Sequence, residues 1–242
     1  MSALRLRSWA MTHPGMKRRH NEDAYVDRPD LGLWAVADGA GGHHAGEVAS
    51  GMIREALEAI PIGLSASELL AEVRGRIEST HEWLRAEAER RGPSVVIAST
   101  VVALLARNEH FACLWAGDSR AYLLRGGTLR QVTRDHSLVQ ELVEAGAIRP
   151  EDAEHHPRAN VITRAVGADL EDFVLDKVSG PIRPGDRFLL CSDGLSKTVP
   201  EDEIGTLLAD QAGVPPPQSL IEAALARNAS DNVTAVAVEA FV

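Results

Sequence analysis

Four aspartates of this 242-residue chain stand beside glycine or asparagine at the ends of short apolar runs: Asp38, Asp118, Asp193 and Asp231. If several strands of one sheet system end together, these carboxylates meet, and close carboxylates repel one another unless a cation lies between them. An all-oxygen ligand set suits Mg²⁺ or Mn²⁺ better than Zn²⁺, which prefers Cys and His. Aspartate beside glycine is also ordinary turn chemistry, so spacing alone leaves both interpretations open.

A basic turn precedes a pair of carboxylates near the N-terminus. Lys17, Arg18 and Arg19 stand three to five residues before Glu22 and Asp23. A phosphate group beside a metal needs a guanidinium fork for its oxygens, and this turn offers one. A solvated turn is the alternative interpretation.

The glycine-rich segment 38–46 matches neither common nucleotide-binding motif. His44 stands where a dinucleotide fingerprint needs its third glycine, and the Lys-Ser/Thr pair of a P-loop is missing. The glycines do permit close backbone approach to a metal, including a carbonyl ligand from Gly39. A histidine just beyond, at His43, can act as a general acid near neutral pH or can simply be solvated.

Cysteine and serine nucleophile motifs are absent. A Cys-x5-Arg phosphate loop needs arginine at position 119 or 197, where the chain has Ser119 and Lys197. Neither Gly-x-Ser-x-Gly nor His-Glu-x-x-His occurs. Both cysteines, Cys113 and Cys191, lie inside apolar runs without a CxxC motif, so we expect buried free thiols in a reducing compartment, the cytoplasm.

The overall charge excludes some partners. Lys plus Arg total 25 and Asp plus Glu total 35, so the formal net charge is 25 − 35 = −10. Such a chain is a poor ligand for nucleic acid or an anionic membrane surface. No apolar leader follows Arg5 and Arg7, and the longest apolar runs have the length of strands. The length fits one domain, residues 1–242.

Strands and helices alternate along the chain. Strands are expected at 31–37, 95–106, 111–116, 121–124, 188–191 and 233–238. Gly126 and Gly127 predict a hairpin and therefore antiparallel pairing. Helices are expected after Gly46, from a capping box at Ser65 to Gly92, and from Ser137. Further helices are expected after Pro200, opened by the pair Thr198 and Glu201, and over 219–227. The polar segment 144–167 predicts a loop-rich lid on an α+β domain.

Eight short blocks, in order over nearly the whole chain, resemble the metal-dependent Ser/Thr protein phosphatases of the PP2C (PPM) family in their bacterial form. They are Gly-x-x-Arg-x-x-Asn-Glu-Asp at 15–23, Ala-Asp-Gly-x-Gly-Gly-His at 37–43, Ser-Thr at 99–100, Ala-Gly-Asp-Ser-Arg at 116–120, Asp-His-Ser at 135–137, Asn-Val-Ile-Thr-Arg-Ala at 160–165, Cys-Ser-Asp-Gly-Leu at 191–195 and Asp-Asn-Val-Thr at 231–234. The resemblance implies an α-β-β-α sandwich, in which helices flank two stacked antiparallel sheets, with a flap at about 140–170.

The resemblance also implies which residues hold two Mn²⁺ or Mg²⁺ ions. Asp38 would bridge the two ions. Asp193 and Asp231 would complete the protein ligands of one ion, and Glu22 and the Gly39 carbonyl would hold the other.

Further roles follow from the same resemblance. Asp118, with Asp193, would form a third, weaker metal site. Asp23 would lie in the second layer around the ions, Arg18 would bind the phosphate, and His43 would be the general acid.

The implied reaction is hydrolysis of phosphoserine or phosphothreonine in proteins by a water that bridges two ions, without a phosphoenzyme. Residues 21–39 more narrowly resemble phosphatases encoded with bacterial type VI secretion systems, which oppose a membrane-bound Ser/Thr kinase and act on an FHA-domain protein. We therefore expect phosphoprotein partners of that kind, neither nucleic acid nor membrane, and a monomer. The alternatives are a catalytically silent phosphatase-like scaffold and a phosphatase of an anti-sigma-factor antagonist.

A few positions depart from the family pattern. Ala40 stands where bacterial members often have Met, and His44 directly follows His43. Lys197 stands where an acid is common. Asn160 replaces a serine that contacts the third metal in some members, which weakens the expected third site.

Overall fold

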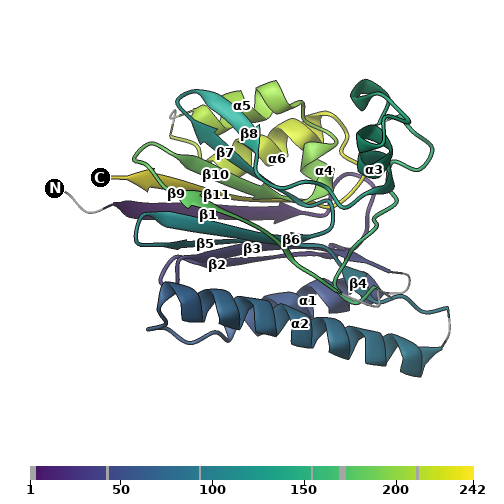
Figure 1. Ribbon diagram of the computed structural model, residues 1–242. Helices are drawn as coiled ribbons and strands as arrows, with labels where there is room; N and C mark the ends of the chain where they lie inside the picture. Colours follow the sequence, from purple (N-terminus) through teal and green to yellow (C-terminus); the bar gives the residue numbers. More distant parts are fainter. Residues whose placement is uncertain (1–3, 42–43, 93, 154, 169–172, 211–212) are drawn as a thin grey trace.

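The computed structural model describes residues 4–41, 44–92, 94–153, 155–168, 173–210 and 213–242. Its elements form four layers, with helices outside two stacked sheets (Figure 1). Every strand pair is antiparallel. The predicted α+β sandwich is therefore confirmed.

The first sheet has the strand order β1-β11-β10-β7-β8. Its strands are β1 (Arg5–His13), β7 (Arg120–Arg125), β8 (Thr128–Gln131), β10 (Arg187–Cys191) and β11 (Val233–Phe241). The β7–β8 hairpin turns at Gly126 and Gly127, which both have positive φ, as predicted. The strand at the N-terminus pairs over its whole length with β11, far along the chain.

The second sheet has the order β2-β3-β5-β6-β9, and the short β4 pairs with β3. Its strands are β2 (Asp23–Arg28), β3 (Leu33–Ala40), β4 (Ala98–Ser99), β5 (Val101–Arg107), β6 (His110–Ala116) and β9 (Asp176–Pro181). The predicted run 95–106 is broken at Thr100, because the backbone N–H of Thr100 donates to the Asp38 carbonyl and its hydroxyl accepts from the Asp38 N–H.

Side-chain alternation along the strands builds the core on both faces of each sheet. Val36 on β3 points into the apolar layer between the sheets, with Phe188 and Val236. Its neighbours Ala35 and Ala37 face the helices below. The continuous apolar runs in the sequence are therefore strands that are buried on both faces.

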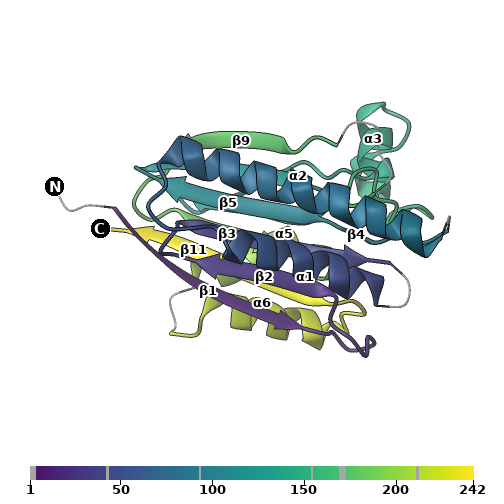
Figure 2. The same cartoon turned by 90° about the horizontal axis from the view of Figure 1, so that it is seen from below.

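Helices α1 (Ala45–Glu58) and α2 (Ala66–Arg91) cover the second sheet, and Figure 2 shows them lying across it. The predicted capping box opens α2: the Glu68 N–H donates to Ser65 Oγ at 3.3 Å, and the Ser65 N–H donates to Glu68 Oε2 at 2.8 Å. Helices α4 (Asp193–Ser196), α5 (Glu201–Ala209) and α6 (Pro216–Ala226) cover the first sheet.

One predicted helix cap and one predicted helix start are wrong. Thr198 does not cap a helix, because it lies in the turn after α4, where its N–H donates to the Leu195 carbonyl. The helix α5 nevertheless begins at Glu201, after Pro200 as predicted. Helix α6 begins at Pro216 rather than at 219, since prolines suit a first helical turn, whose N–H groups have no partner within the helix. Strands β1, β2 and β9 were not predicted.

The segment 138–166, which we call the flap, lies at the end of the sandwich opposite the two termini (Figure 1). Its described residues form α3 (Leu138–Glu144), the single turn η1 (Pro150–Asp152), and turns and irregular backbone. Isolated bridges from Ser137 to Ile162 and from Ser99 to Val166 hold its ends. The predicted loop-rich character of this region is confirmed. No helix in the described ranges is long and apolar enough to cross a lipid bilayer.

Candidate metal centre and active site

Strand pairing brings the first two acids together. Asp23, at the start of β2, is the direct cross-strand partner of Asp38 on β3. Asp38 lies inside β3, two residues before its end, and not after the strand as predicted. Asp118 follows β6, Asp193 begins α4 directly after β10, and Asp231 precedes β11. The aspartates thus come from both sheets at one end of the sandwich.

Two hydroxyl groups hold Asp23 between the sheets. Ser192 Oγ and Thr234 Oγ1 donate to Asp23 Oδ2 at 2.8 and 2.6 Å, and the Thr234 N–H donates to Ser192 Oγ at 3.0 Å. The other oxygen, Oδ1, is buried without a hydrogen-bond partner. Burial raises the pKa of Asp23 to about 7, against the effect of both hydroxyl donors. Asp23 is thus a buried carboxylate with neutral donors only.

Asp38 lies among like charges. Burial, and then the charges of Asp23, Asp193, Asp118 and Asp231, raise the pKa of Asp38 well above its usual range. An opposite charge nearby would have the reverse effect. Asp38 and these four aspartates therefore share one electrostatic neighbourhood.

Asn232 fastens the N-terminal loop to the start of β11. Its Nδ2 donates to the carbonyls of Pro14 and His20 at 3.0 and 2.9 Å, and its Oδ1 accepts from the Glu22 N–H at 2.8 Å. These three hydrogen bonds hold the loop 14–22 next to Asp231. As a result Arg18 lies within reach of that aspartate, with Nη2 at 2.9 Å from Asp231 Oδ2.

Gly39 allows two backbone segments to approach closely. Its N–H donates to the Glu22 carbonyl at 3.1 Å, and a Cβ at this position would lie 2.2 Å from the Gly46 carbonyl oxygen. Ser50 Oγ also donates to the Glu22 carbonyl, at 2.5 Å. Any larger residue at 39 would push β3 away from α1 and from Glu22.

The carboxylates on the flap side have a cationic partner. The Lys197 ammonium lies 3.0 Å from Asp118 Oδ2, 2.7 Å from Asp193 Oδ2 and 3.2 Å from the flap residue Asn160 Oδ1. Asp118 is 3% exposed, and its Oδ1 is buried without a hydrogen-bond partner. Burial and the Asp193 charge raise the pKa of Asp118, and both carboxylates raise the pKa of Lys197 above its usual range.

The donor set fits two divalent ions around Asp38. Within the described ranges, no three His, Cys, Asp or Glu side chains converge on one point, and Lys197 and Arg18 lie against the carboxylates instead. The donors are nevertheless all oxygens, as Mg²⁺ and Mn²⁺ prefer, and the raised pKa of Asp38 indicates a centre that needs more positive charge. At Asp118 the ammonium of Lys197 already provides such a charge.

The predicted general acid, His43, lies outside the described residues. Its neighbour His44 is described: it precedes α1 with φ 62°, packs edge-on against the His20 ring at 4.6 Å, and lies 3.5 Å from Glu47. The role of His43 stays a prediction.

The Asp-His-Ser block at 135–137 lies at the start of the flap, where the Thr163 N–H donates to the His136 carbonyl at 2.9 Å. His136 Nδ1 accepts from the Gly117 N–H at 3.1 Å, so the proton on its other nitrogen is directed at Asp176 Oδ2, 3.2 Å away. Its ring stacks on Trp115. Burial lowers the pKa of His136. Asp135 binds Arg120 through both carboxylate oxygens.

Sequence reasoning named the acids and missed the groups that position them. Ser192, Thr234 and Asn232 each bond to a residue more than 160 positions away. Spacing along the chain carries no signal for such contacts. Their only trace in the sequence is that they lie inside the blocks 191–195 and 231–234 of the resemblance.

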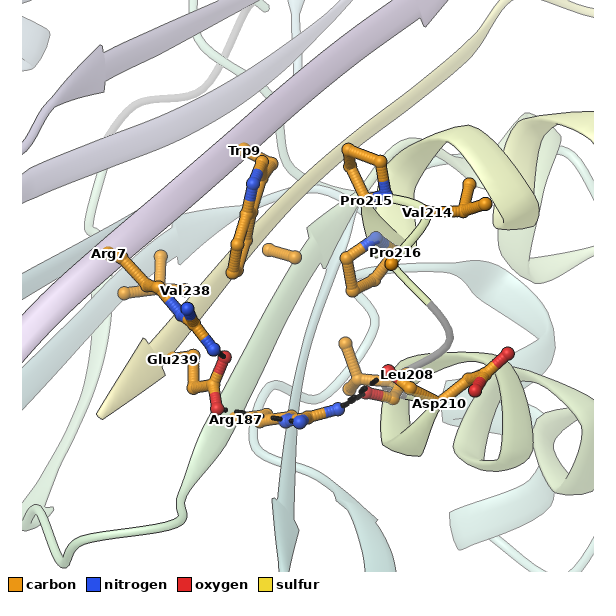
Figure 3. Close-up of a pocket in the computed structure, with 12 residues that line it drawn as sticks. Arg7, Trp9, Arg187, Leu208, Asp210, Val214, Pro215, Pro216, Val238 and Glu239 are labelled. Carbon is orange, nitrogen blue, oxygen red and sulfur yellow. Dashed lines mark hydrogen bonds and ion pairs between the residues drawn. The ribbon is translucent and has the colours of Figure 1, made fainter. Parts of the chain in front are cut away.

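Two cavities differ in their relation to this centre. One, of about 250 Å³, lies under the flap and is lined by Asp118, Lys197, Val139 and His155 among others. The other, of about 290 Å³, is lined by Trp9, Pro216 and Arg187 (Figure 3).

The cavity of Figure 3 is remote from the acids. Glu239 on its wall lies six residues along β11 from Val233, about 20 Å at the rise of a strand. Its charged groups pair with one another, since Glu239 binds both Arg7 and Arg187. The cavity under the flap is therefore the one that adjoins the candidate site.

The sandwich with acids at one end is the fold of the bacterial Ser/Thr phosphatases. The chain matches the solved structure of PppA of Pseudomonas aeruginosa, described as a key regulatory component of T6SS, with TM-score 0.90 and 46% identity over 98% of both chains. It also matches the catalytic domain of the phosphatase PstP in complex with two manganese ions, with TM-score 0.84 and 35% identity over 99% of this chain and 100% of that one.

Sequence comparison agrees with the structural matches. The family model of protein phosphatase 2C matches residues 17–227, and the chain belongs to this family. It is 35% identical to the serine/threonine phosphatase stp of Listeria monocytogenes, over 94% of this chain and 93% of the relative. It is 37% identical to PstP of Mycobacterium tuberculosis over 96% of this chain, but it spans only 44% of that protein's length.

Proposed function

We propose that this chain is a divalent-metal-dependent protein phosphatase that hydrolyses phosphoserine and phosphothreonine in proteins. The observation that carries the proposal is the position of Asp38, whose pKa is raised by burial and by four other aspartates, beside a loop that presents Arg18. Relatives named as Ser/Thr protein phosphatases, and a PstP structure with two manganese ions, support it.

The residues divide between two ions as the resemblance implies. Asp38 would contact both; Asp193 and Asp231 would hold one, and Glu22 with the Gly39 carbonyl would hold the other. Bound ions would make an attacking water more acidic and neutralise charge on the phosphoryl oxygens. Asp23, which accepts from Ser192 and Thr234, would hold β2 against the first sheet behind the ions.

Arg18 would bind the phosphoryl group. Its contact with Asp231 uses one terminal nitrogen, and its side chain is 56% exposed, so a planar face of the guanidinium remains accessible. A bidentate pair with two phosphate oxygens would orient the group for in-line attack. His43 would protonate the serine or threonine oxygen that leaves.

Metal dependence is tested on two substrates, p-nitrophenyl phosphate and a phosphothreonine peptide. We expect hydrolysis with Mn²⁺ or Mg²⁺, none in EDTA, and none for Asp38→Asn with either metal. Asp202→Asn, which changes an exposed aspartate on α5, is the matched control and should keep full activity. Full activity in EDTA would exclude the proposal. Calorimetry that finds no divalent ion bound would favour the silent scaffold instead.

The substrate belongs to the finer part of the proposal. We assign the chain to the control of type VI secretion, where it would oppose a Ser/Thr kinase and act on that kinase or on an FHA-domain protein. The similarity to PppA supports this assignment. Phosphoproteomics of a deletion strain should show phosphothreonine rising on one such protein, and an unchanged phosphoproteome would contradict it.

Location and assembly complete the proposal. Cys113 and Cys191 are buried free thiols, which supports a reducing compartment, the cytoplasm. A single domain over residues 1–242 accords with the apolar layer that both sheets share, and we propose that it acts as a monomer. Sedimentation equilibrium of the purified chain tests the assembly state.

A further inference from the structure

Lys197 is held by three oxygens from three separate parts of the chain. Asp118 follows β6, Asp193 begins α4, and Asn160 belongs to the flap. The ammonium lies 3.0, 2.7 and 3.2 Å from their side-chain oxygens. An ammonium has three N–H donors, and each has an acceptor here. The side chain is 30% exposed, so much of this contact is shielded from water.

The same three residues are the ones the resemblance connects with a third metal ion. In this chain a side-chain cation already lies between them. A divalent ion needs carboxylate oxygens at about 2.0 to 2.6 Å, and an ammonium that touches the same oxygens repels it. The residues at Asp118 therefore do not fit a third ion as long as Lys197 keeps this position.

We propose that the Lys197 ammonium replaces a third divalent ion at Asp118 and Asp193 and ties the flap to the body through Asn160. The ion count rests on the proposed function, because it presumes two ions at Asp38. The tie to the flap does not. In a site built this way, docking of the flap is independent of the metal concentration.

The cavity under the flap explains what the loss of Lys197 would expose. Lys197 lines that cavity together with Asp118. Truncation of the side chain would leave Asp118 facing an open space of about 250 Å³. It would also leave the oxygens of Asp193 and Asn160 that contact the ammonium without that cation. Three oxygen donors without a cation suit Mn²⁺.

The first experiment counts ions. The purified full chain is dialysed to equilibrium against MnCl₂, and bound manganese is measured by mass spectrometry in the wild type, Lys197→Ala, Lys197→Arg and Lys177→Ala. Lys177→Ala removes an exposed lysine of β9 and serves as the control. We expect two ions per chain in the wild type, the arginine variant and the control, and three in Lys197→Ala.

The difference in bound manganese between Lys197→Ala and the wild type tests the role of Lys197. The number of ions bound by the wild type tests the proposed function. Equal counts in Lys197→Ala and wild type would overturn the replacement of an ion by Lys197, and so would three ions in the wild type. A wild type that binds no manganese would instead contradict the proposed phosphatase mechanism.

The second experiment follows the flap without any metal. Trypsin can cut after Arg158, an exposed residue two positions before Asn160. In EDTA we expect this cut to be about tenfold faster in Lys197→Ala and in Asn160→Ala, which is the scale of one charge-assisted hydrogen bond. Lys197→Arg and Lys177→Ala should match the wild type.

Adding manganese distinguishes the loss of the contact between Lys197 and the flap from a general loss of structure. Adding MnCl₂ should slow the cut in Lys197→Ala, where an ion can take the place of the ammonium. Equal cleavage rates in EDTA for wild type and Lys197→Ala would overturn the tie. Equal rates for Lys197→Ala with and without manganese would overturn the exchange of lysine for an ion.

Discussion

Asp23 and Asp118 are both buried carboxylates at the same end of the sandwich, and their surroundings are opposite. Asp23 accepts from two hydroxyl groups, which carry no net charge. Asp118 accepts from the ammonium of Lys197. Each keeps one buried oxygen without a hydrogen-bond partner. The difference is therefore the charge of the donor and not the degree of burial.

The comparison shows two ways to keep an acid inside a protein. Hydroxyl donors hold Asp23 in place but do not neutralise its negative charge, so a cation from outside the chain is needed to do so. An ammonium neutralises Asp118 within the chain, and the carboxylate is then less available to an ion. Under the proposed function, the β2–β3 side of the site would depend on metal, whereas the flap side has the ammonium of Lys197 as its cation.

The largest expected effect concerns Asp193, which lies between the β2–β3 side and the flap side of the site. Asp193→Asn removes a proposed ligand of one core ion and a partner of Lys197. We therefore expect kcat on a phosphothreonine peptide to fall about a thousandfold, equivalent to several kcal/mol of charge stabilisation. Asp118→Asn should lower kcat less than tenfold, because Lys197 keeps Asp193. Steady-state kinetics at saturating Mn²⁺ measures both. Equal losses of kcat in Asp193→Asn and Asp118→Asn would contradict the difference between the two sides of the site.

The second effect is a dependence of stability on pH when metal is removed. The pKa of Asp23 is raised from 3.8 to about 7, so the folded protein binds an extra proton between those values. Stability in EDTA should therefore fall as pH rises from about 4 to 7, and the melting temperature should drop by about 5 °C or more. Thermal unfolding followed by circular dichroism measures it.

The matched variant for this pH effect is Asp23→Asn, which should flatten the profile. Mn²⁺ should flatten it as well, because a nearby cation favours the charged carboxylates. A wild-type melting temperature in EDTA that rises over this range would contradict the assignment of neutral surroundings to Asp23.

A third, smaller effect concerns one hydroxyl group. Thr234→Val keeps the shape of the side chain and removes two hydrogen bonds, the 2.6 Å one that Thr234 donates to Asp23 and the 2.7 Å one that it accepts from Thr12 Oγ1. It should lower the free energy of unfolding by about 1–3 kcal/mol. Urea unfolding in the presence of EDTA measures the change. The control is Thr206→Val, since Thr206 is an exposed threonine on α5 that bonds only within its own helix. Equal changes in both variants would mean that the link to Asp23 stabilises nothing.

The smallest effect is expected on the flap side. In Asp118→Asn the amide oxygen still accepts from Lys197, and one of two like charges beside that ammonium is lost. The free energy of unfolding in EDTA should change by less than about 1 kcal/mol. A loss as large as that of Thr234→Val would show that the ion pair at Asp118 supports the fold and not only the site.

Much of the site was predictable because its acids lie at strand ends. Asp118 and Asp193 each lie two residues beyond the last residue of an apolar strand, and those strands, buried on both faces, are easy to recognise. β1 and β2 were missed because their side chains alternate less clearly and many are half-buried. The start of α6 was missed because a proline run suits either a loop or a first helical turn.

The contacts across the sandwich were beyond sequence reasoning for a physical reason. Asp23 meets Thr234 only after two sheets have stacked, and no periodicity records which strand lies opposite another. The contact of Lys197 with Asp118 is of the same kind: position 197 was noted as a departure from the family, and its geometry alone connects it with the flap.

The pairing of β1 with β11 has a consequence for how the molecule is made. β11 lies between β1 and β10, and Asn232 at its start holds the loop that carries Arg18. A ribosome releases residues in order, so β1 must wait for more than 200 further residues before its neighbour exists. Contacts of such sequence separation slow folding. We therefore expect nascent chains that end before β11 to lack both a closed first sheet and phosphatase activity, which delays the enzyme until its synthesis has passed Phe241.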